Sequence, residues 1–168
     1  MMPDRSQSRE PPRPLCAVTD QNRDRIALLL DEYMRYMEQY QPPGAMQLEA
    51  DPRETFANGE DGFEPYGIEG PTRILAGFVF LRVYPRGLYV VDMFVEPPRQ
   101  RFGYGTLAID AVKTMATERH LNAVGASVFR RNVLAQRFWA RQGFTYVSTS
   151  TELGYEHMFD TFTWTLRR

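Results

Sequence analysis

The sequence predicts an α/β (α+β) fold, with a central mixed, mostly antiparallel sheet of about seven strands flanked by about four helices. Short apolar or alternating runs bounded by glycine and proline predict the strands, and longer runs with helical spacing of apolar residues predict the helices. Two of the helices connect strands in the second half of the chain, which implies some parallel pairing. The 168 residues, 43% of them hydrophobic, suit one domain with a full-sized core.

The first half of the chain is expected to form a strand, two helices and three strands. Asp20 is the expected N-cap of the first helix, and Asp51-Pro52 is the expected start of the second. Pro85-Arg86-Gly87 predicts a hairpin turn between two long strands. One face of the first helix is apolar and carries Ile26, Leu29, Leu30, Tyr33 and Met37. The expected ranges are strand 15–19, helices 20–40 and 51–57, and strands 63–68, 73–84 and 88–95.

The second half is expected to alternate helices and strands before two closing strands. Gly143 occupies a C-cap position and ends the last helix. The expected ranges are helices 103–120 and 132–142 and strands 123–129, 144–150 and 156–166. The polar residues 1–14 carry four prolines and are interpreted as a flexible tail, followed by a single domain over 15–168.

Composition excludes several classes of function. The formal net charge of −1 gives no overall field that would recruit nucleic acid or an anionic membrane, and no apolar run approaches the ~20 residues of a membrane span. Cys16 is the single cysteine, so no internal disulfide can form, and we expect it to be a small buried side chain rather than a catalytic thiol. Only two histidines occur, which argues against a histidine-rich metal site. We expect a cytoplasmic protein without a metal.

Charge is unevenly distributed along the chain. Residues 31–69 contain ten acidic and two basic side chains, whereas residues 97–141 contain eight basic and two acidic ones. The basic half would suit an anionic cofactor and the acidic half would attract a cation. The alternative is that these are solvated faces that happen to segregate.

One segment predicts a phosphate-binding loop. Residues 95–106 read V-E-P-P-R-Q-R-F-G-Y-G-T and lie between a predicted strand and a predicted helix. Unpaired N–H groups and the dipole at a helix start favour an anion, and glycine allows its close approach. Gly103-Tyr-Gly105-Thr-Leu-Ala108 also matches the dinucleotide pattern G-x-G-x-x-A, but seven residues separate the strand from Gly103, and the match lies in the last 40% of the chain rather than at the start of a repeated βαβ array.

Two motifs together resemble another family. Gln100-x-x-Gly103-x-Gly105 is similar to the [QR]-x-x-G-x-[GA] pyrophosphate motif of the GCN5-related N-acetyltransferase superfamily. Asn132-x-x-Ala135-x-x-Phe138-Trp139-x-x-x-Gly143-Phe144 resembles the second signature of the same family, N-x-x-A-x-x-x-Y-x-x-x-G-F. The motifs occur in the expected order, separated by the expected helix and strand. The expected order of helices and strands resembles the family over about residues 15–168.

The resemblance implies that coenzyme A occupies the loop and that the fourth and fifth strands splay apart to admit its acyl thioester. Loop amides would surround the pyrophosphate, main-chain groups of the fourth strand would pair with the pantetheine arm, and Asn132 would contact that arm. Arg137 or Arg141 could meet the adenosine phosphates, or could lie on a solvated helix face. The implied cofactor-binding residues are Met93, Phe94, Val95, Gln100, Arg101, Phe102, Gly103, Tyr104, Gly105, Thr106, Asn132 and Arg137.

The expected catalytic residues depart from the family pattern. Trp139 stands where the family has a tyrosine that protonates the thiolate, and an indole N–H cannot release its proton at ordinary pH. Ser127 stands where one subgroup has a glutamate base. Asp92 interrupts an otherwise apolar strand, so it is either the general base, with a pKa raised by burial, or a structural aspartate. Glu152, Glu156 and His157 are weaker candidates.

The acceptor is expected to be a small cationic amine. In the family, the N-terminal helix and the loop after it line the acceptor side, and here the helix carries Glu32, Tyr33 and Tyr36, an aromatic and acidic set that suits a cation. The predicted activity is transfer of an acetyl group from acetyl-coenzyme A to a primary amine. The alternatives are a protein N-terminus or lysine as acceptor, or a non-catalytic acyl-coenzyme A sensor. A homodimer is compatible with the resemblance, and no nucleic acid or membrane partner is expected.

Overall fold

The computed structural model describes residues 14–42, 51–151 and 155–166. The predicted tail over 1–14 therefore lies outside the described residues, apart from Pro14. The order of helices and strands agrees with the prediction, with one added 3₁₀ turn, η1. The elements are β1 (Leu15–Ala17), α1 (Arg23–Glu38), α2 (Pro52–Asn58), β2 (Phe63–Glu69), β3 (Leu75–Tyr84), β4 (Gly87–Val95), η1 (Pro97–Arg99), α3 (Tyr104–Glu118), β5 (Ala123–Phe129), α4 (Val133–Arg141), β6 (Thr145–Thr149) and β7 (Phe159–Thr165).

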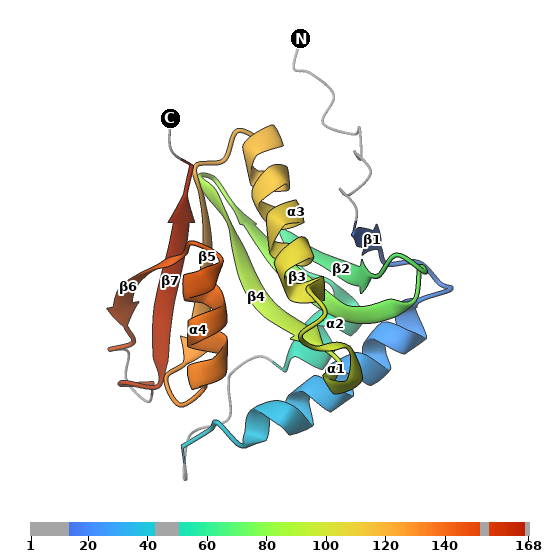
Figure 1. Ribbon diagram of the computed structural model, residues 1–168, viewed down its shortest axis with the longest axis horizontal. Coiled ribbons are helices and arrows are strands. Elements are labelled where there is room, and N and C mark those ends of the chain that lie inside the picture. The colour runs from blue at the N-terminus through green and yellow to red at the C-terminus, as the bar shows by residue number, and fades with distance from the viewer. Residues whose placement is uncertain (1–13, 43–50, 152–154, 167–168) are drawn as a thin grey trace.

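The strands form one seven-stranded sheet in the order β1-β2-β3-β4-β5-β7-β6 (Figure 1). Among its neighbouring pairs, β4 and β5 are parallel and the others are antiparallel. The crossover through α3 produces the parallel pair, while β7 inserts between β5 and β6 and pairs with both. The predicted mixed, mostly antiparallel α/β fold is confirmed.

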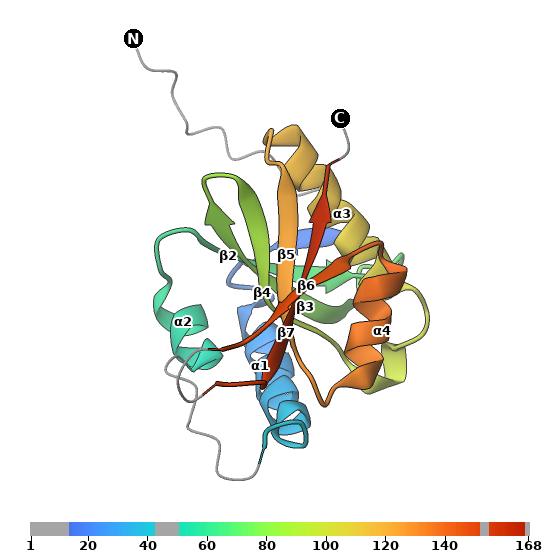
Figure 2. The same ribbon diagram turned by 90° about the vertical axis from the view of Figure 1, so that its left-hand side faces the viewer.

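Two hydrophobic clusters lie on opposite faces of the sheet. The larger cluster contains buried residues of α3 and α4 packed on β3, β4 and β5, and the smaller contains those of α1 and α2 packed on Phe78, Phe80 and Phe94. Figure 2 shows α2 on one side of the strands and α3 and α4 on the other. Among the helices described, none is both long and apolar enough to cross a membrane.

Two features of the sheet shape the region beside β4. The parallel pairing of β4 with β5 runs only from Gly87 to Val90, so the two strands splay apart beyond it, as predicted. The register of β4 against β3 also shifts, because Leu81 pairs with Val90 and Phe80 with Asp92, which leaves one extra residue in β4. Such a bulge reverses which side chains face the core.

Two predicted boundaries are wrong. The N-cap of α1 is Asn22 rather than Asp20, because the carbonyl of Thr19 accepts from the amides of Asn22 and Arg23 in a turn that precedes the helix. The last strand begins at Phe159, three residues later than expected at residue 156, because residues 156–158 form a turn.

Candidate active site

A cleft of about 980 Å³ lies where β4 and β5 separate, bordered by α1, the first turn of α3 and the start of α4. Clefts of roughly 300–1,000 Å³ are typical of small-molecule sites. The structure brings most of the sequence-predicted site residues to this one cleft. Those that line it are Tyr33, Tyr36, Asp92, Met93, Phe94, Val95, Gln100, Arg101, Gly103, Tyr104, Gly105, Thr106, Asn132 and Trp139.

The loop before α3 has the geometry of an anion-binding site. Arg101 and Gly103 have φ angles of 68° and 89°, and such left-handed residues turn backbone amides toward one side. Gly103 is the N-cap of α3, and the first hydrogen bond within the helix runs from the amide of Leu107 to the carbonyl oxygen of Gly103, at 3.0 Å. The N–H groups of residues 104–106 therefore lack a helical acceptor, and the helix dipole adds partial positive charge there.

Side chains from neighbouring elements hold this loop in place. Glu96 accepts from Arg25 of α1 and from Arg99 of η1, each at 2.5 Å. The side-chain amide of Gln100 donates to the carbonyl oxygen of Val95 at 2.8 Å. These contacts tie the loop both to the end of β4 and to α1, so its shape is set by the fold before any ligand binds.

Polar groups on both sides of the gap can receive an extended ligand arm. β4 pairs with β3 as far as Val95 but with β5 only as far as Val90, so main-chain groups of 91–95 border the cleft. An added chain can pair with such a free strand edge. Across the gap, Asn132 caps α4, with its Oδ1 accepting from the amide of Ala135 at 3.0 Å. Its Nδ2 makes no hydrogen bond within the described residues and can donate to a ligand.

The bulge in β4 determines which way Asp92 points. Leu88 and Val90 belong to the cluster under α3, and strict alternation would place Asp92 there as well. After the bulge Phe94 belongs to the cluster under α1 instead. Asp92 thus lines the cleft and accepts a hydrogen bond from the hydroxyl of Tyr33 at 2.8 Å.

Burial raises the pKa of the Asp92 carboxyl to about 6, although the hydrogen bond from Tyr33 acts in the opposite direction. Burial, together with the same pairing, keeps the pKa of Tyr33 well above its usual range, so this phenol stays protonated. At neutral pH Asp92 is therefore mainly a carboxylate, with a proton affinity suited to a general base.

Comparison with known proteins identifies the architecture around this cleft. The family described as "Acetyltransferase (GNAT) family" matches residues 20–144, a span that includes the loop, Asp92 and the start of α4. The chain belongs to this family. It is therefore an acyl-coenzyme-A-dependent N-acetyltransferase, an enzyme of a family that uses acetyl-coenzyme A. No curated protein matches the sequence.

Solved structures of GNAT acetyltransferases share this fold. The PaiA N-acetyltransferase from Thermoplasma acidophilum, solved in complex with coenzyme A, is 11% identical, with a TM-score of 0.69 over 90% of this chain and 98% of that chain. The spermidine N-acetyltransferase from Vibrio cholerae, solved with coenzyme A and spermine, is 19% identical, with a TM-score of 0.67 over 90% and 94%. An acetyltransferase from Staphylococcus aureus Mu50 is 12% identical, with a TM-score of 0.69 over 91% and 98%.

The structure does not bring three of the predicted residues to the cleft of this GNAT protein. Phe102 is 76% exposed, Arg137 lies exposed on α4, and Glu32 of α1 is not among the lining residues. Arg141, the alternative to Arg137 in the sequence, does line the cleft. Positions four residues apart lie on the same face of a helix, so spacing alone could not choose between these two arginines.

The two departures from the GNAT pattern have structural explanations. Trp139 is 6% exposed, and its ring packs edge-on against Phe144 at 4.8 Å between ring centroids, so it serves both as cleft wall and as core. Ser127 cannot act as a base. Its Oγ accepts from the hydroxyl of Tyr89 and lies 3.1 Å from the Oγ1 of Thr161.

The weaker candidates that the structure describes do not line the cleft. Glu156 and His157 are not lining residues, and Glu152 lies outside the described residues. Cys16 is half-buried on β1, and burial together with Glu69 raises the pKa of its thiol to about 11, so a thiolate is disfavoured. Within the described ranges, no group of three or more His, Cys, Asp or Glu side chains could hold a metal ion.

Proposed function

We propose that this enzyme transfers the acetyl group of acetyl-coenzyme A to the primary amine of a small cationic acceptor, with Asp92 as the general base. The observation that carries the proposal is the position of Asp92: a carboxylate with a raised pKa lies in the cleft beside the free edge of β4. Coenzyme A supplies an activated acyl group as its thioester. The protein must position an amine against it and accept the proton that the amine loses.

The wall of the cleft next to Asp92 is aromatic. Tyr33 and Tyr36 of α1 each pack against Phe94, with ring centroids 5.8 Å apart in both pairs. Aromatic faces next to a carboxylate favour an ammonium group, through the ring quadrupole and direct charge attraction. Asp92 would attract the protonated amine and, directly or through a water molecule, remove the proton that must leave before attack.

The remaining steps use groups that the fold already provides. A main-chain N–H near Val95 would stabilise the oxyanion that develops on the attacked carbonyl. Trp139 would pack beside the thioester, and water would protonate the departing thiolate because an indole cannot. We assign the pyrophosphate to the amides of residues 101–106 and the pantetheine arm to residues 93–95 and Asn132. We expect this reaction to occur in the cytoplasm.

Calorimetry with coenzyme A, combined with a thiol-release assay over a panel of acceptors, tests the proposal. The panel should contain a linear diamine, a monoamine of the same chain length, and a peptide with a free N-terminus and one lysine. We expect coenzyme A to bind and the diamine to be turned over faster than the monoamine or the peptide. Turnover of the peptide alone would overturn the small-amine acceptor. Binding of coenzyme A without turnover of any amine would overturn catalysis in favour of a sensor.

A further inference from the structure

A row of hydroxyl groups crosses the sheet from the cleft toward its outer edge. Ser127 of β5 is paired with Thr161 of β7, and Thr161 is paired with Ser148 of β6. Paired residues share a face of the sheet. Tyr89 of β4 extends the row, because its hydroxyl donates to Ser127. Neighbouring strands lie roughly 4.8 Å apart, so the row runs about 10 Å outward from Ser127. We call these four residues the hydroxyl row.

A second cavity, of about 570 Å³, lies along this row. None of its described lining residues carries a carboxylate or a basic group, and all except Phe159 carry a hydroxyl. Ser127 and Phe159 also line the main cleft, so the two spaces are adjacent and meet at these residues. A ligand held in the main cleft can therefore extend into a space whose described lining is uncharged and rich in hydroxyls.

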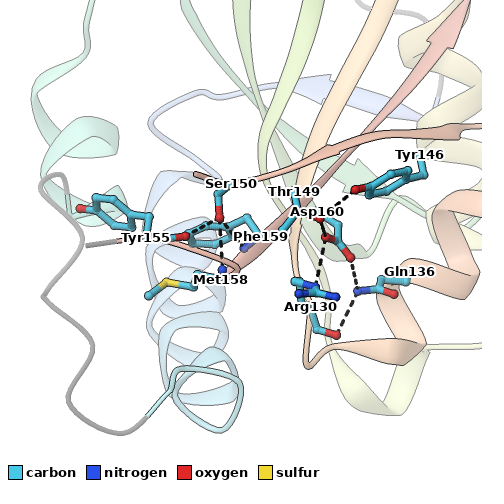
Figure 3. Close-up of polar contacts among 9 residues, drawn as sticks. All are labelled: Arg130, Gln136, Tyr146, Thr149, Ser150, Tyr155, Met158, Phe159 and Asp160. Atoms are coloured by element: carbon cyan, nitrogen blue, oxygen red, sulfur yellow. Dashed lines mark hydrogen bonds and ion pairs between the residues drawn. The ribbon is translucent and has the colours of Figure 1, made fainter. Parts of the chain in front are cut away.

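The far wall of the second cavity is fixed by internal hydrogen bonds (Figure 3). The Oγ of Ser150 accepts from the amides of Met158 and Phe159 at 3.2 and 3.0 Å. The hydroxyl of Thr149 donates to Asp160 at 2.7 Å, and this carboxylate, only 8% exposed, is also held by side chains from the β5–α4 loop and α4. The hydroxyls of Thr149 and Ser150 therefore already hold the fold, and the cavity is formed before a ligand arrives.

The inner end of the hydroxyl row keeps one hydrogen-bond donor for a ligand. Tyr89, Ser127 and Thr161 have three hydroxyl hydrogens, and within the described residues they make two hydrogen bonds to one another. Tyr89 donates to Ser127, and either Ser127 or Thr161 donates to the other. One hydroxyl hydrogen is therefore left over in both arrangements, on Ser127 or on Thr161, and both residues line the second cavity.

We propose that the second cavity is an acceptor subsite that binds the neutral, polyhydroxylated part of an amine, such as a sugar-like ring, while the main cleft presents its amino group to Asp92. The inference rests on the proposed function and adds the substrate class to it. Described lining residues without charge suit a neutral group, hydroxyls on successive strands match several hydroxyls of one ring, and Phe159 covers an apolar face.

A matched pair of acceptors tests this subsite. Glucosamine and cyclohexylamine both present a primary amine on a six-membered ring, but only glucosamine carries ring hydroxyls. We expect kcat/KM to be higher for glucosamine. In Thr161→Val and Ser148→Ala we expect the ratio of the two kcat/KM values to fall about 5- to 10-fold, as the loss of a ligand hydrogen bond predicts. Thr163→Val, on the same face of β7 but outside both cavities, should keep the wild-type ratio.

Calorimetry separates failure of the subsite from failure of the proposed function. Glucosamine is titrated into the enzyme saturated with coenzyme A, and binding that weakens in Thr161→Val supports the subsite even without turnover. If cyclohexylamine is acetylated and glucosamine neither binds nor reacts, the subsite is overturned and the proposed function stands. An equal loss with both amines in Thr161→Val, or preferential binding of a peptide, would also overturn the subsite.

Discussion

The cofactor side and the acceptor side of the cleft are built in different ways. On the cofactor side, one continuous segment, residues 95–106, presents backbone amides shaped by two left-handed residues. On the acceptor side, single side chains come from α1, β4 and β5, far apart in the sequence. Backbone recognition depends on local conformation, whereas the acceptor side depends on how distant elements pack. A substitution on one side should therefore leave the other side largely unchanged.

The largest effect is expected for Asp92→Asn. The amide keeps the size of the side chain and can still accept from Tyr33, but it cannot take up a proton. We expect kcat/KM for the amine to fall about 10²- to 10⁴-fold, while the Kd for coenzyme A changes little. Steady-state kinetics and calorimetry measure the two quantities. Asp110→Asn, on the exposed face of α3, is the matched control. Equal losses of turnover and coenzyme A affinity would assign Asp92 a structural role.

The fold itself should respond to pH through the same group. The raised pKa of Asp92 means that the folded protein binds this proton more tightly than the unfolded chain does. Stability from this group is therefore present at low pH and declines as pH rises from about 4 through about 6. We expect the Tm of Asp92→Asn, relative to wild type, to be higher at pH 8 than at pH 4.5. A constant difference in Tm would contradict the raised pKa.

An intermediate effect is expected on the cofactor side for Gly103→Val. Gly103 has a φ of 89°, which a β-branched residue adopts only with strain, and its backbone borders the cleft. We expect coenzyme A affinity to fall about tenfold, for a cost of about 1–2 kcal/mol. Gly59→Val is the control, because Gly59 has a φ of 70° and equally open surroundings but lies at the end of α2. A similar loss of affinity in both variants would mean that general destabilisation, not the loop, is responsible.

The same contrast explains how much the sequence could predict. The order of strands and helices follows from local patterns and the splayed pair from the resemblance to the family, and the structure agrees with both. The bulge in β4 could not be predicted, because it depends on the register against β3, and it is what turns Asp92 toward the cleft. Arg137 and Arg141 share a helix face, so only the packing of α4 in the fold shows that Arg141 borders the cleft and Arg137 does not.

The acceptor side was predictable only as a list of candidates. Tyr33 and Asp92 are 59 positions apart, and no spacing rule brings them to 2.8 Å. The hydroxyl row likewise depends on the insertion of β7 between β5 and β6, which places Thr161 next to Ser127. In the sequence, Ser127 is notable only because it replaces an expected glutamate. The structure shows that its hydroxyl contacts those of Tyr89 and Thr161.

The smallest effect is expected for Tyr33→Phe, which keeps the aromatic wall and removes one hydrogen bond to Asp92. Because that bond lowers the pKa of Asp92, its loss should move the pKa upward from about 6, and the acidic limb of the kcat/KM profile should follow. A hydrogen bond of about 1 kcal/mol corresponds to a shift of somewhat less than about one pH unit. Tyr36→Phe is the control, because the hydroxyl of Tyr36 contacts Tyr40 rather than Asp92. A limb that stays in place in Tyr33→Phe, or moves equally in both variants, would show that Asp92 does not set the pH dependence and would leave the acceptor side without its base.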